Sequence, residues 1–165
     1  MTNLLQDQLR LRVLGWGVGC DLMEPNTDVG RDIRFVSGSN GLLDLARVET
    51  IDNLGQSLSI ALTTALGSDL FNVRYGFDGI NAMAEETDPV LMRERIRVSV
   101  INVVRADPRV RRIIDVKLED GRLDPVSAGS RVLDVRVAFE TLSGDQYTIN
   151  IGQLAVAAGQ VTSNG

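Results

Sequence analysis

The feature that most constrains the fold is a segment bracketed by two prolines, DPVLMRERIRVSVINVVRADPRVRR at residues 88–112. Asp88 can cap a helix whose first residue is Pro89, because the N–H that proline lacks would have no partner at that position. Pro108 predicts that the helix ends near residues 105–106, since the residue before a proline is disfavoured in the α region. The segment therefore predicts one long helix with a defined start and a defined end.

The same segment reverses the charge of the chain locally. Seven of the seventeen basic residues lie between Arg93 and Arg112, with only the acids Glu94 and Asp107 among them, although the whole chain has a formal net charge of −5. Sixteen of the seventeen are arginine, whose planar guanidinium suits carboxylate partners and interfaces. A genome rich in G and C would produce the same bias. By itself the segment indicates an interaction helix and leaves its partner open.

Apolar residues occupy two faces of this expected helix. The main stripe, which recurs at helical spacing, consists of Met92, Ile96, Val100, Val103 and Val104. A second set lies among the arginines, where an ordinary surface helix is polar; it consists of Val90, Val98 and Ile101. Either other elements of the chain cover the second face, or a partner chain covers it.

Composition removes most catalytic chemistry. Histidine is absent and Cys20 is the single cysteine, which excludes the usual catalytic triads and the common zinc and haem ligand sets. The remaining candidates are the carboxylates of Glu85, Glu86 and Asp88. Neighbouring residues in one loop cannot straddle a sugar bond as a glycosidase requires, and acids before a helix complement its dipole. We predict no enzymatic activity, no metal and no cofactor.

The amino-terminal sequence, MTNLLQDQLRLRVLGWG, has no apolar run long enough for a signal peptide or a membrane span. A lone cysteine is compatible with folding in a reducing compartment. An acidic balance with 4% aromatic residues argues against nucleic-acid binding. We therefore expect assembly in the cytoplasm, with no membrane insertion and no nucleic-acid partner.

The first part of the chain predicts an arm followed by a β-hairpin. Residues 1–31 are expected to be extended or loop-rich, with residues 1–14 as either a strand or a short arm. Residues 32–36 alternate polar and apolar side chains, which is typical of a strand. Residues 42–48 can return as a second strand after the glycine-containing turn at 37–41, so the two strands could pair as a hairpin.

A core-facing helix is predicted next. It starts at Thr50 or Asp52, and Gly67 is expected to close it at the C′ position. Its apolar residues gather on one face, which predicts that the helix packs on the core. Residues 68–84 then contain several turn-forming residues and predict a loop that carries Tyr75.

The carboxyl-terminal half changes to the two-residue period of strands. Strands are predicted over residues 113–119, 131–140 and 147–151, with a tight turn at Ser143-Gly144 between the last two. From residue 155 onward the chain is small and polar, and we expect either a flexible tail or an arm that becomes ordered only on a partner. The predicted architecture is one α+β domain over residues 1–154, with an amino-terminal β-hairpin and two main helices packed on one face of an antiparallel three-stranded meander.

The triplet Asp107-Pro108-Arg109 follows the long helix directly. Proline fixes the bend, so the acid and the arginine are presented at a defined angle. Arg109 could then make a bidentate contact with a carboxylate on a neighbouring protein. The alternative is a plain helix stop with Arg109 in water.

The order of these motifs resembles a known family. A glycine-rich start, the strand and turn DIRFVSGSNG and the helix IDNLGQSLSIALTTALGS come first. The loop at residues 74–77, the helix RERIRVSVINVVRADPRV and a meander ending in YTINIGQL follow. Over residues 15–154 the chain resembles the "lysozyme-like" baseplate wedge family of contractile phage tails and injection systems, which includes a type VI secretion counterpart.

The resemblance extends to two short motifs of this family. Asp107-Pro108-Arg109 occupies the place of its Glu-Pro-Arg triplet, with Asp in place of Glu, and the shorter acid keeps the charge but reaches less far. Tyr75-Gly76 stands where the family has an aromatic residue followed by glycine. The resemblance implies a small structural subunit of a phage tail-like or injection particle.

The resemblance also implies partners. Larger baseplate wedge subunits would bind the long helix and its terminal turn, and the sheath subunit would pair with the hairpin at residues 131–151. The central spike or hub is a further candidate partner. The expected partner-binding residues are Tyr75, Arg97, Val98, Ile101, Arg105, Asp107, Pro108 and Arg109. Two alternatives stay open, namely a peptidoglycan hydrolase, as the family label suggests, and an unrelated soluble binding domain.

Overall fold

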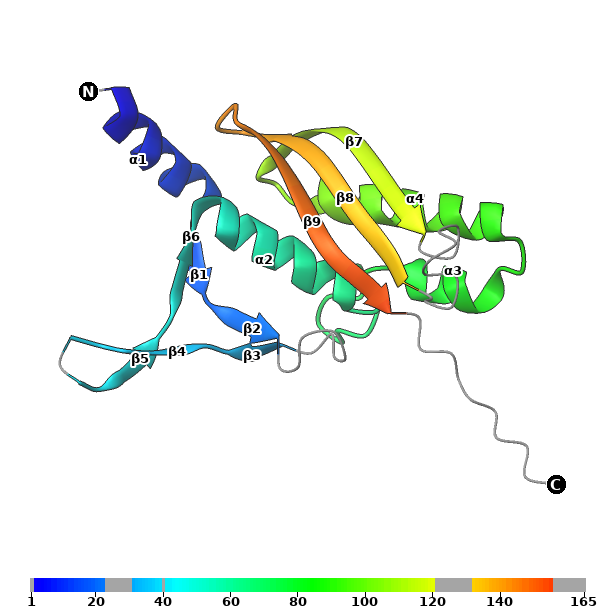
Figure 1. Cartoon of the computed structure of the whole chain (residues 1–165), viewed down its shortest axis with the longest axis horizontal. Helices are drawn as coiled ribbons and strands as arrows, with labels where there is room; N and C mark the ends of the chain where they lie inside the picture. Colours follow the sequence, from blue (N-terminus) through cyan, green and yellow to red (C-terminus); the bar gives the residue numbers. More distant parts are fainter. Residues whose placement is uncertain (1, 23–30, 40, 121–131, 156–165) are drawn as a thin grey trace.

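The computed structural model describes residues 2–22, 31–39, 41–120 and 132–155, and Figure 1 shows the arrangement of the elements. The helices are α1 (Thr2–Leu14), α2 (Thr50–Thr63), α3 (Gly79–Glu85) and α4 (Pro89–Ala106). The short strands are β1 (Trp16–Val18), β2 (Cys20–Leu22), β3 (Arg31–Ile33), β4 (Phe35–Ser37), β5 (Leu43–Leu45) and β6 (Arg47–Glu49). The long strands are β7 (Val110–Asp120), β8 (Val132–Thr141) and β9 (Gln146–Ala155).

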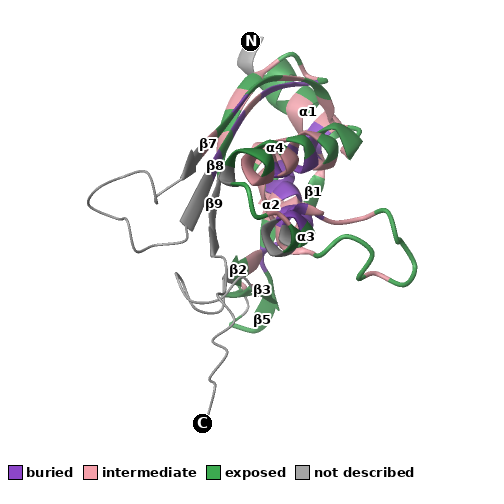
Figure 2. Ribbon diagram, turned by 90° about the vertical axis from the view of Figure 1, so that its right-hand side faces the viewer, coloured by how far each residue is buried: buried purple, intermediate pink, exposed green. Residues whose placement is uncertain are grey.

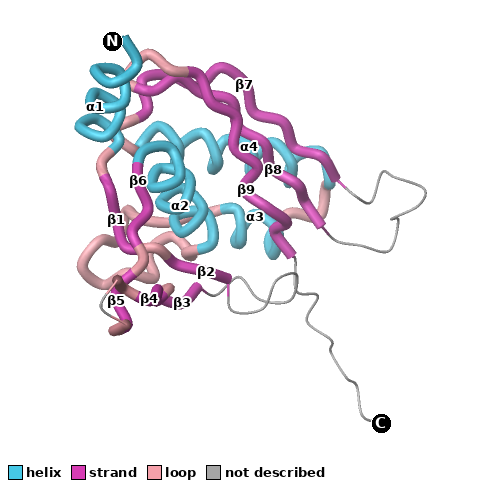
Figure 3. The backbone as a smooth tube through the Cα atoms, turned by 60° about the vertical axis from the view of Figure 1, so that its left-hand side comes forward, coloured by secondary structure: helices cyan, strands magenta, loops and turns pink. Residues whose placement is uncertain are grey.

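The fold is α+β, with α2 and α4 packed on one face of the antiparallel meander β7-β8-β9, as predicted (Figures 1 and 3). Alternate residues of β8 point toward the helices because successive side chains of a strand face opposite sides. The core joins three sets of buried side chains, from β8 (Val135, Val137 and Phe139), from α2 (Leu54, Leu58 and Leu62) and from α4 (Ile96, Val100 and Val104).

The boundaries of α4 agree with the prediction from its two prolines. The Asp88 carboxylate accepts a hydrogen bond of 2.8 Å from the backbone N–H of Val90, which satisfies a donor of the first turn. The helix ends at Ala106, and Asp107 is extended at the C-cap. The predicted main stripe also faces the core.

Helix α2 starts at Thr50 as predicted, but the prediction that Gly67 closes it is wrong. The helix ends at Thr63, because Thr64 turns into an extended conformation. The carbonyl of Thr64 accepts a hydrogen bond of 2.8 Å from the N–H of Phe77, and Phe77 is buried in the core. A backbone bridge to a residue far along the chain therefore ends the helix, and Gly67 serves the following turn with a φ of +81°.

Two further predictions need correction. Residues 2–14 form helix α1 instead of a strand or an extended arm. Leucine, glutamine and arginine dominate this stretch and are good helix formers, and Leu14 at its end is buried in the core. Residues 68–84 were predicted as a loop, yet this stretch includes most of the short helix α3. The connection between the first two strands of the meander, at residues 121–131, and the expected tail at 156–165 lie outside the described residues.

The predicted amino-terminal hairpin exists as β4 paired with β5, with Phe35 opposite Leu45. Both predicted strands are nevertheless interrupted, because three two-stranded ribbons (β1–β6, β2–β3 and β4–β5) meet at one point. A ring of three backbone hydrogen bonds closes this junction: Gly19 donates to Ala46 (2.7 Å), Ala46 to Arg34 (2.9 Å) and Arg34 to Gly19 (2.8 Å). A strand that continued past Arg34 or Ala46 would break the ring.

Figure 2 shows that burial is uneven across the molecule: the buried residues concentrate in the helices and the meander, whereas the ribbons around β5 are mostly exposed. None of the helices that the structure describes combines the length and apolar content that a membrane span requires.

Candidate docking groove

A groove of about 800 Å³ lies between α2, the loop at residues 64–78 and the outer side of α4. Its apolar lining includes Leu58, Leu66, Leu91, Val98 and Val103. Charged and polar groups at its rim include Arg74, Tyr75, Asp107 and Arg109. Five of the eight residues predicted to bind a partner line it: Tyr75, Val98, Asp107, Pro108 and Arg109. An apolar lining with a few polar groups suits a ligand that buries apolar surface, whether a small molecule or a side chain of a partner protein.

The Asp107-Pro108-Arg109 turn is held by its own side chains. The Arg109 guanidinium donates from Nη2 to Asp107 Oδ2 (2.6 Å) and from Nε to Asp107 Oδ1 (2.9 Å). The backbone N–H of Arg109 also donates to Asp107 Oδ1 (2.9 Å), and its Nη1 reaches the Leu14 carbonyl (3.3 Å). The guanidinium of Arg109 is therefore already bound within the chain, to the Asp107 carboxylate and the Leu14 carbonyl. A bidentate contact with a neighbour stays a prediction, and such a neighbour would compete with Asp107.

Tyr75 is half-buried at the rim of the groove. Burial raises the pKa of its phenol, and the nearby negative charges of Asp107 and Asp69 raise this pKa further. The phenol therefore stays protonated at neutral and mildly alkaline pH. Its O–H is available as a hydrogen-bond donor to a ligand in the groove.

The chain itself covers only part of the second apolar face of α4, and a partner as the cover of the rest stays a prediction. Ile101 packs against the core, so the chain itself covers it. Val98 is 55% exposed and lines the groove, and Val90 is 69% exposed and lies outside the lining. Arg97 forms an ion pair with Glu94 (3.7 Å) on its own helix, whereas Arg105 is exposed in the last turn, where a cation complements the helix dipole.

Acidic side chains from other elements offset the basic segment. Arg95 contacts Glu86 (2.8 Å) and Glu85 (3.2 Å) at the end of α3. Arg111 and Arg112 on β7 both bind Glu140 on β8, at 3.0 and 2.6 Å. The hydrogen bond from Arg112 and the charges of both arginines hold the pKa of Glu140 below its ordinary value. Because the acids lie outside residues 93–112, the charge inversion in the sequence largely disappears in the fold.

The carboxylates considered as catalytic candidates also belong to this network. Glu85 and Glu86 both face the same guanidinium, and their hydrogen bonds raise the pKa of Arg95. Asp88 caps α4. Each of the three carboxylates therefore has a structural partner. Within the ranges that the structure describes, no group of three or more Cys, Asp and Glu side chains is arranged to hold a metal ion.

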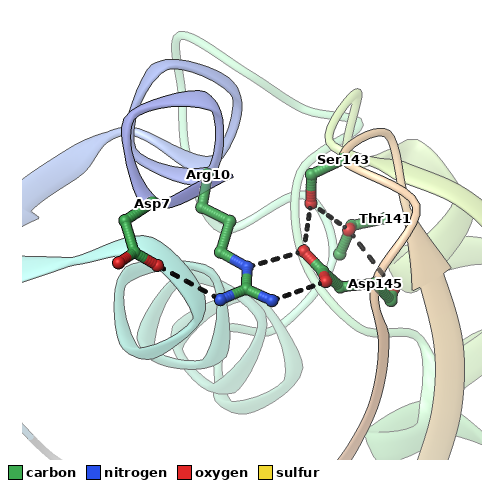
Figure 4. Close-up of polar contacts among 5 residues, drawn as sticks. All are labelled: Asp7, Arg10, Thr141, Ser143 and Asp145. Atoms are coloured by element: carbon green, nitrogen blue, oxygen red, sulfur yellow. Dashed lines mark hydrogen bonds and ion pairs between the residues drawn. The ribbon is translucent and has the colours of Figure 1, made fainter. Parts of the chain in front are cut away.

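A second polar cluster, which the sequence did not predict, ties α1 to the turn between β8 and β9 (Figure 4). Arg10 donates from Nε and Nη2 to the two carboxylate oxygens of Asp145, at 2.9 and 2.8 Å. Ser143 donates to the same carboxylate (2.9 Å), and Asp7 lies 3.3 Å from the guanidinium. The hydrogen bond from Arg10 lowers the pKa of Asp145. The partners are separated by 135 positions, so no local pattern could reveal the pair.

The two edges of the meander differ. In the described part of the chain, β7 and β9 each pair on one side only, with β8 between them. The register of β7 shifts twice along β8, between Val110 and Arg112 and between Ile113 and Asp115. Such bulges discourage further pairing. The β8–β9 pairing shifts once, between Asp134 and Arg136, so β9 is the more regular of the two edges and the better candidate for an added strand.

No protein-family model matches the chain, and a comparison with curated proteins finds no match.

Proposed function

We propose that this chain is a structural, non-enzymatic baseplate subunit of a contractile tail or injection system. In this role it joins larger wedge proteins to the first sheath ring. The observation that carries the proposal is the groove, which gathers Tyr75, Val98 and the Asp107-Pro108-Arg109 turn on one face. They are five of the eight residues that the sequence predicts to bind a partner.

The groove supports a helical ligand from the wedge scaffold. Its floor presents exposed apolar side chains of α4, in particular Leu91 and Val98, together with Leu66 from the opposite wall. An amphipathic helix laid into the groove would bury these side chains and meet polar groups at the rim. Burial of apolar surface would supply most of the affinity, and the rim would set the orientation.

The free edge of β9 supports the second contact. A sheath segment that pairs there would extend the meander by one strand through backbone hydrogen bonds. The opposite edge is less suited because the β7–β8 pairing has two register shifts, whereas the β8–β9 pairing has one. One subunit would thus offer a groove to the wedge and a sheet edge to the sheath.

Substituting a groove residue that the fold does not need tests the wedge contact. Val98→Asp places a charge on the apolar floor, and because Val98 is 55% exposed the domain should keep its stability. We expect particles assembled with this variant to be absent by electron microscopy when it replaces the natural subunit. Val90→Asp is the matched control, since Val90 is 69% exposed on the same helix but lies outside the groove lining.

Normal particle yield with Val98→Asp would contradict the groove assignment. Loss of particles with both variants would indicate a general defect of α4 and would contradict it equally. Arg109→Ala is a weaker test, because it also removes the internal contacts to Asp107 and Leu14. A gene neighbourhood without sheath, tube and spike genes would contradict the proposed function as a whole.

A further inference from the structure

Two large apolar side chains stand in water at the tip of the loop beside the groove. Leu70 is 87% exposed and Phe71 is 100% exposed. A single exposed apolar residue is ordinary, but an adjacent pair on a protruding loop is a common mark of a contact surface. Aromatic residues in particular contribute strongly when they are buried at an interface.

Local hydrogen bonds hold this loop in place. The Asp69 carboxylate accepts from the N–H of Phe71 (2.9 Å), and the Asn72 carbonyl accepts from Tyr75 (2.9 Å). At the base, the N–H of Leu66 donates to the carbonyl of Phe77 (3.2 Å). These bonds fix the backbone of the loop in a conformation in which the side chain of Phe71 is fully exposed.

The protrusion and the groove lie next to each other. Leu66, Arg74 and Tyr75 flank the loop tip in the sequence and also line the groove. A protruding part and a hollow on one face of a molecule are self-complementary under a two-fold axis. We infer that two copies of this chain form a symmetric dimer in which each inserts Leu70 and Phe71 into the groove of the other.

Size and charge agree with this arrangement. A groove of about 800 Å³ can accept both side chains, and its lining includes the apolar residues Leu58, Leu66, Leu91, Val98 and Val103. Arg74 at the rim makes no hydrogen bond or ion pair with the rest of the described chain. Asp69 uses Oδ1 for the loop and keeps Oδ2 for another contact. In the dimer, Asp69 of one copy would approach Arg74 of the other, which adds charge complementarity.

The inference does not depend on the proposed tail function. A second copy is favoured over an unrelated protein because this chain carries both halves of the contact. If the groove also binds a wedge subunit, the two occupants exclude each other, and the dimer would be a form of the subunit before its incorporation.

Sedimentation velocity of the full chain from roughly 1 to 100 μM tests the inference. We expect a concentration-dependent monomer–dimer equilibrium with a dissociation constant in the range of about 1–100 μM. Phe71→Ala should raise this constant at least about tenfold, because the loss of a central aromatic contact is costly. The substitution should not alter the circular dichroism spectrum, since Phe71 makes no buried contact in the monomer.

A mixture of two variants tests whether insertion is reciprocal. Val98→Asp blocks the groove, and Phe71→Ala removes the inserted side chain. In a heterodimer of the two variants, Phe71 of the Val98→Asp copy can still enter the unmodified groove of the Phe71→Ala copy, so one of the two contacts stays intact. The mixture should associate more tightly than either variant alone. Leu43→Ala is the control, because Leu43 is exposed on the β4–β5 ribbon, away from the groove.

Three results would overturn the inference. The first is a protein that stays monomeric over the whole concentration range. The second is a dimer that Leu43→Ala weakens and Phe71→Ala does not. The third is a mixture that associates no better than its separate components.

Discussion

The helical body and the ribbon region treat apolar side chains in opposite ways. In the body, formed by α2, α4 and the meander, Phe139 is 0% exposed and lies between strands and helices. In the ribbon region, which comprises the described residues between 16 and 49, the phenylalanine for comparison is Phe35, whose side chain is 59% exposed. Every residue of β4 and β5 is exposed (Figure 2). The body encloses a core, although Leu91 and Val98 of α4 stay exposed at the groove, whereas the ribbons leave most of their large apolar side chains exposed.

Different forces must therefore hold the two regions. Burial of apolar surface stabilises the body. A two-stranded ribbon alone is marginal in water, so the ribbons depend on the ring of backbone bonds at Gly19, Arg34 and Ala46 and on anchors to α2. Two of these anchors are Gln56, which bonds the backbone of Val18 and Cys20, and Ser59, which accepts from Arg31 (2.6 Å). The comparison indicates that directional polar contacts maintain the ribbon shape while its apolar faces stay free.

The largest expected difference is between the two phenylalanines. Phe139→Ala should lower the free energy of unfolding by about 3–5 kcal/mol, because it leaves a cavity between the sheet and the helices. Phe35→Ala should change it by less than about 0.5 kcal/mol, since the side chain is largely in water. Urea denaturation of both variants measures the difference. Equal losses would show that the ribbon face is packed in solution and would break the comparison.

A smaller effect is expected where the ribbons join the body. A Cβ at Gly17 would lie 2.6 Å from Asn53 Oδ1, and the Asn53 side chain is buried with its amide bonded to the Leu14 carbonyl. Gly17→Ala should therefore destabilise the protein by about 1–3 kcal/mol, because Asn53 must move.

Gly55→Ala is the matched control for this substitution. A Cβ at Gly55, inside α2, would make an ordinary contact of 3.7 Å with Ile149. Alanine is favoured over glycine within a helix, so this variant should be more stable by about 0.5–1 kcal/mol. Thermal denaturation of the two variants should give shifts of opposite sign. Shifts of the same sign would contradict the packing at the Gly17 junction.

The smallest effect concerns the ion pair that fastens α1 to the body. The folded pKa of Asp145 lies below its ordinary value, so its stabilising contribution is present above that ordinary value and is lost as the pH falls through the lowered pKa. Asp145→Asn should thus be less stable than the parent protein at neutral pH, and the difference should vanish in strong acid. Urea titrations between about pH 2 and 7 measure this difference.

Arg10→Gln should reproduce the behaviour of Asp145→Asn, because it removes the other half of the same pair. The double variant should be no less stable than either single one, since the two side chains act on each other. Additive losses, or a difference that persists in strong acid, would contradict the assignment.

Local patterns were sufficient for the long elements. The two prolines predicted both ends of α4, and alternation predicted the strands of the meander, because capping and side-chain periodicity depend on neighbouring residues. The same reasoning failed for α1, where Leu9, Leu11 and Val13 imitate a strand although the stretch consists of good helix formers. It also placed the end of α2 too late, because a contact with Phe77 ends that helix.

The candidate site was partly predictable. Of the eight residues predicted to bind a partner, five line the groove (Tyr75, Val98, Asp107, Pro108 and Arg109), and three do not (Arg97, Ile101 and Arg105). The sequence could not reveal that Ile101 belongs to the core, or that Leu66, Leu91 and Arg74 complete the walls. A groove depends on how α2, α4 and the intervening loop pack together, which no single segment encodes.

The sequence by itself determined the secondary elements whose signals are local, and it determined an acidic chain without histidine. Tertiary structure decided which charged side chains are paired within the chain and which are available to a partner. Arg95, Arg111 and Arg112 read as part of a basic interaction segment, yet Glu85, Glu86 and Glu140 reach them from other elements. An ion pair depends on a distance of a few ångströms in space, and the number of residues between two charges does not fix that distance.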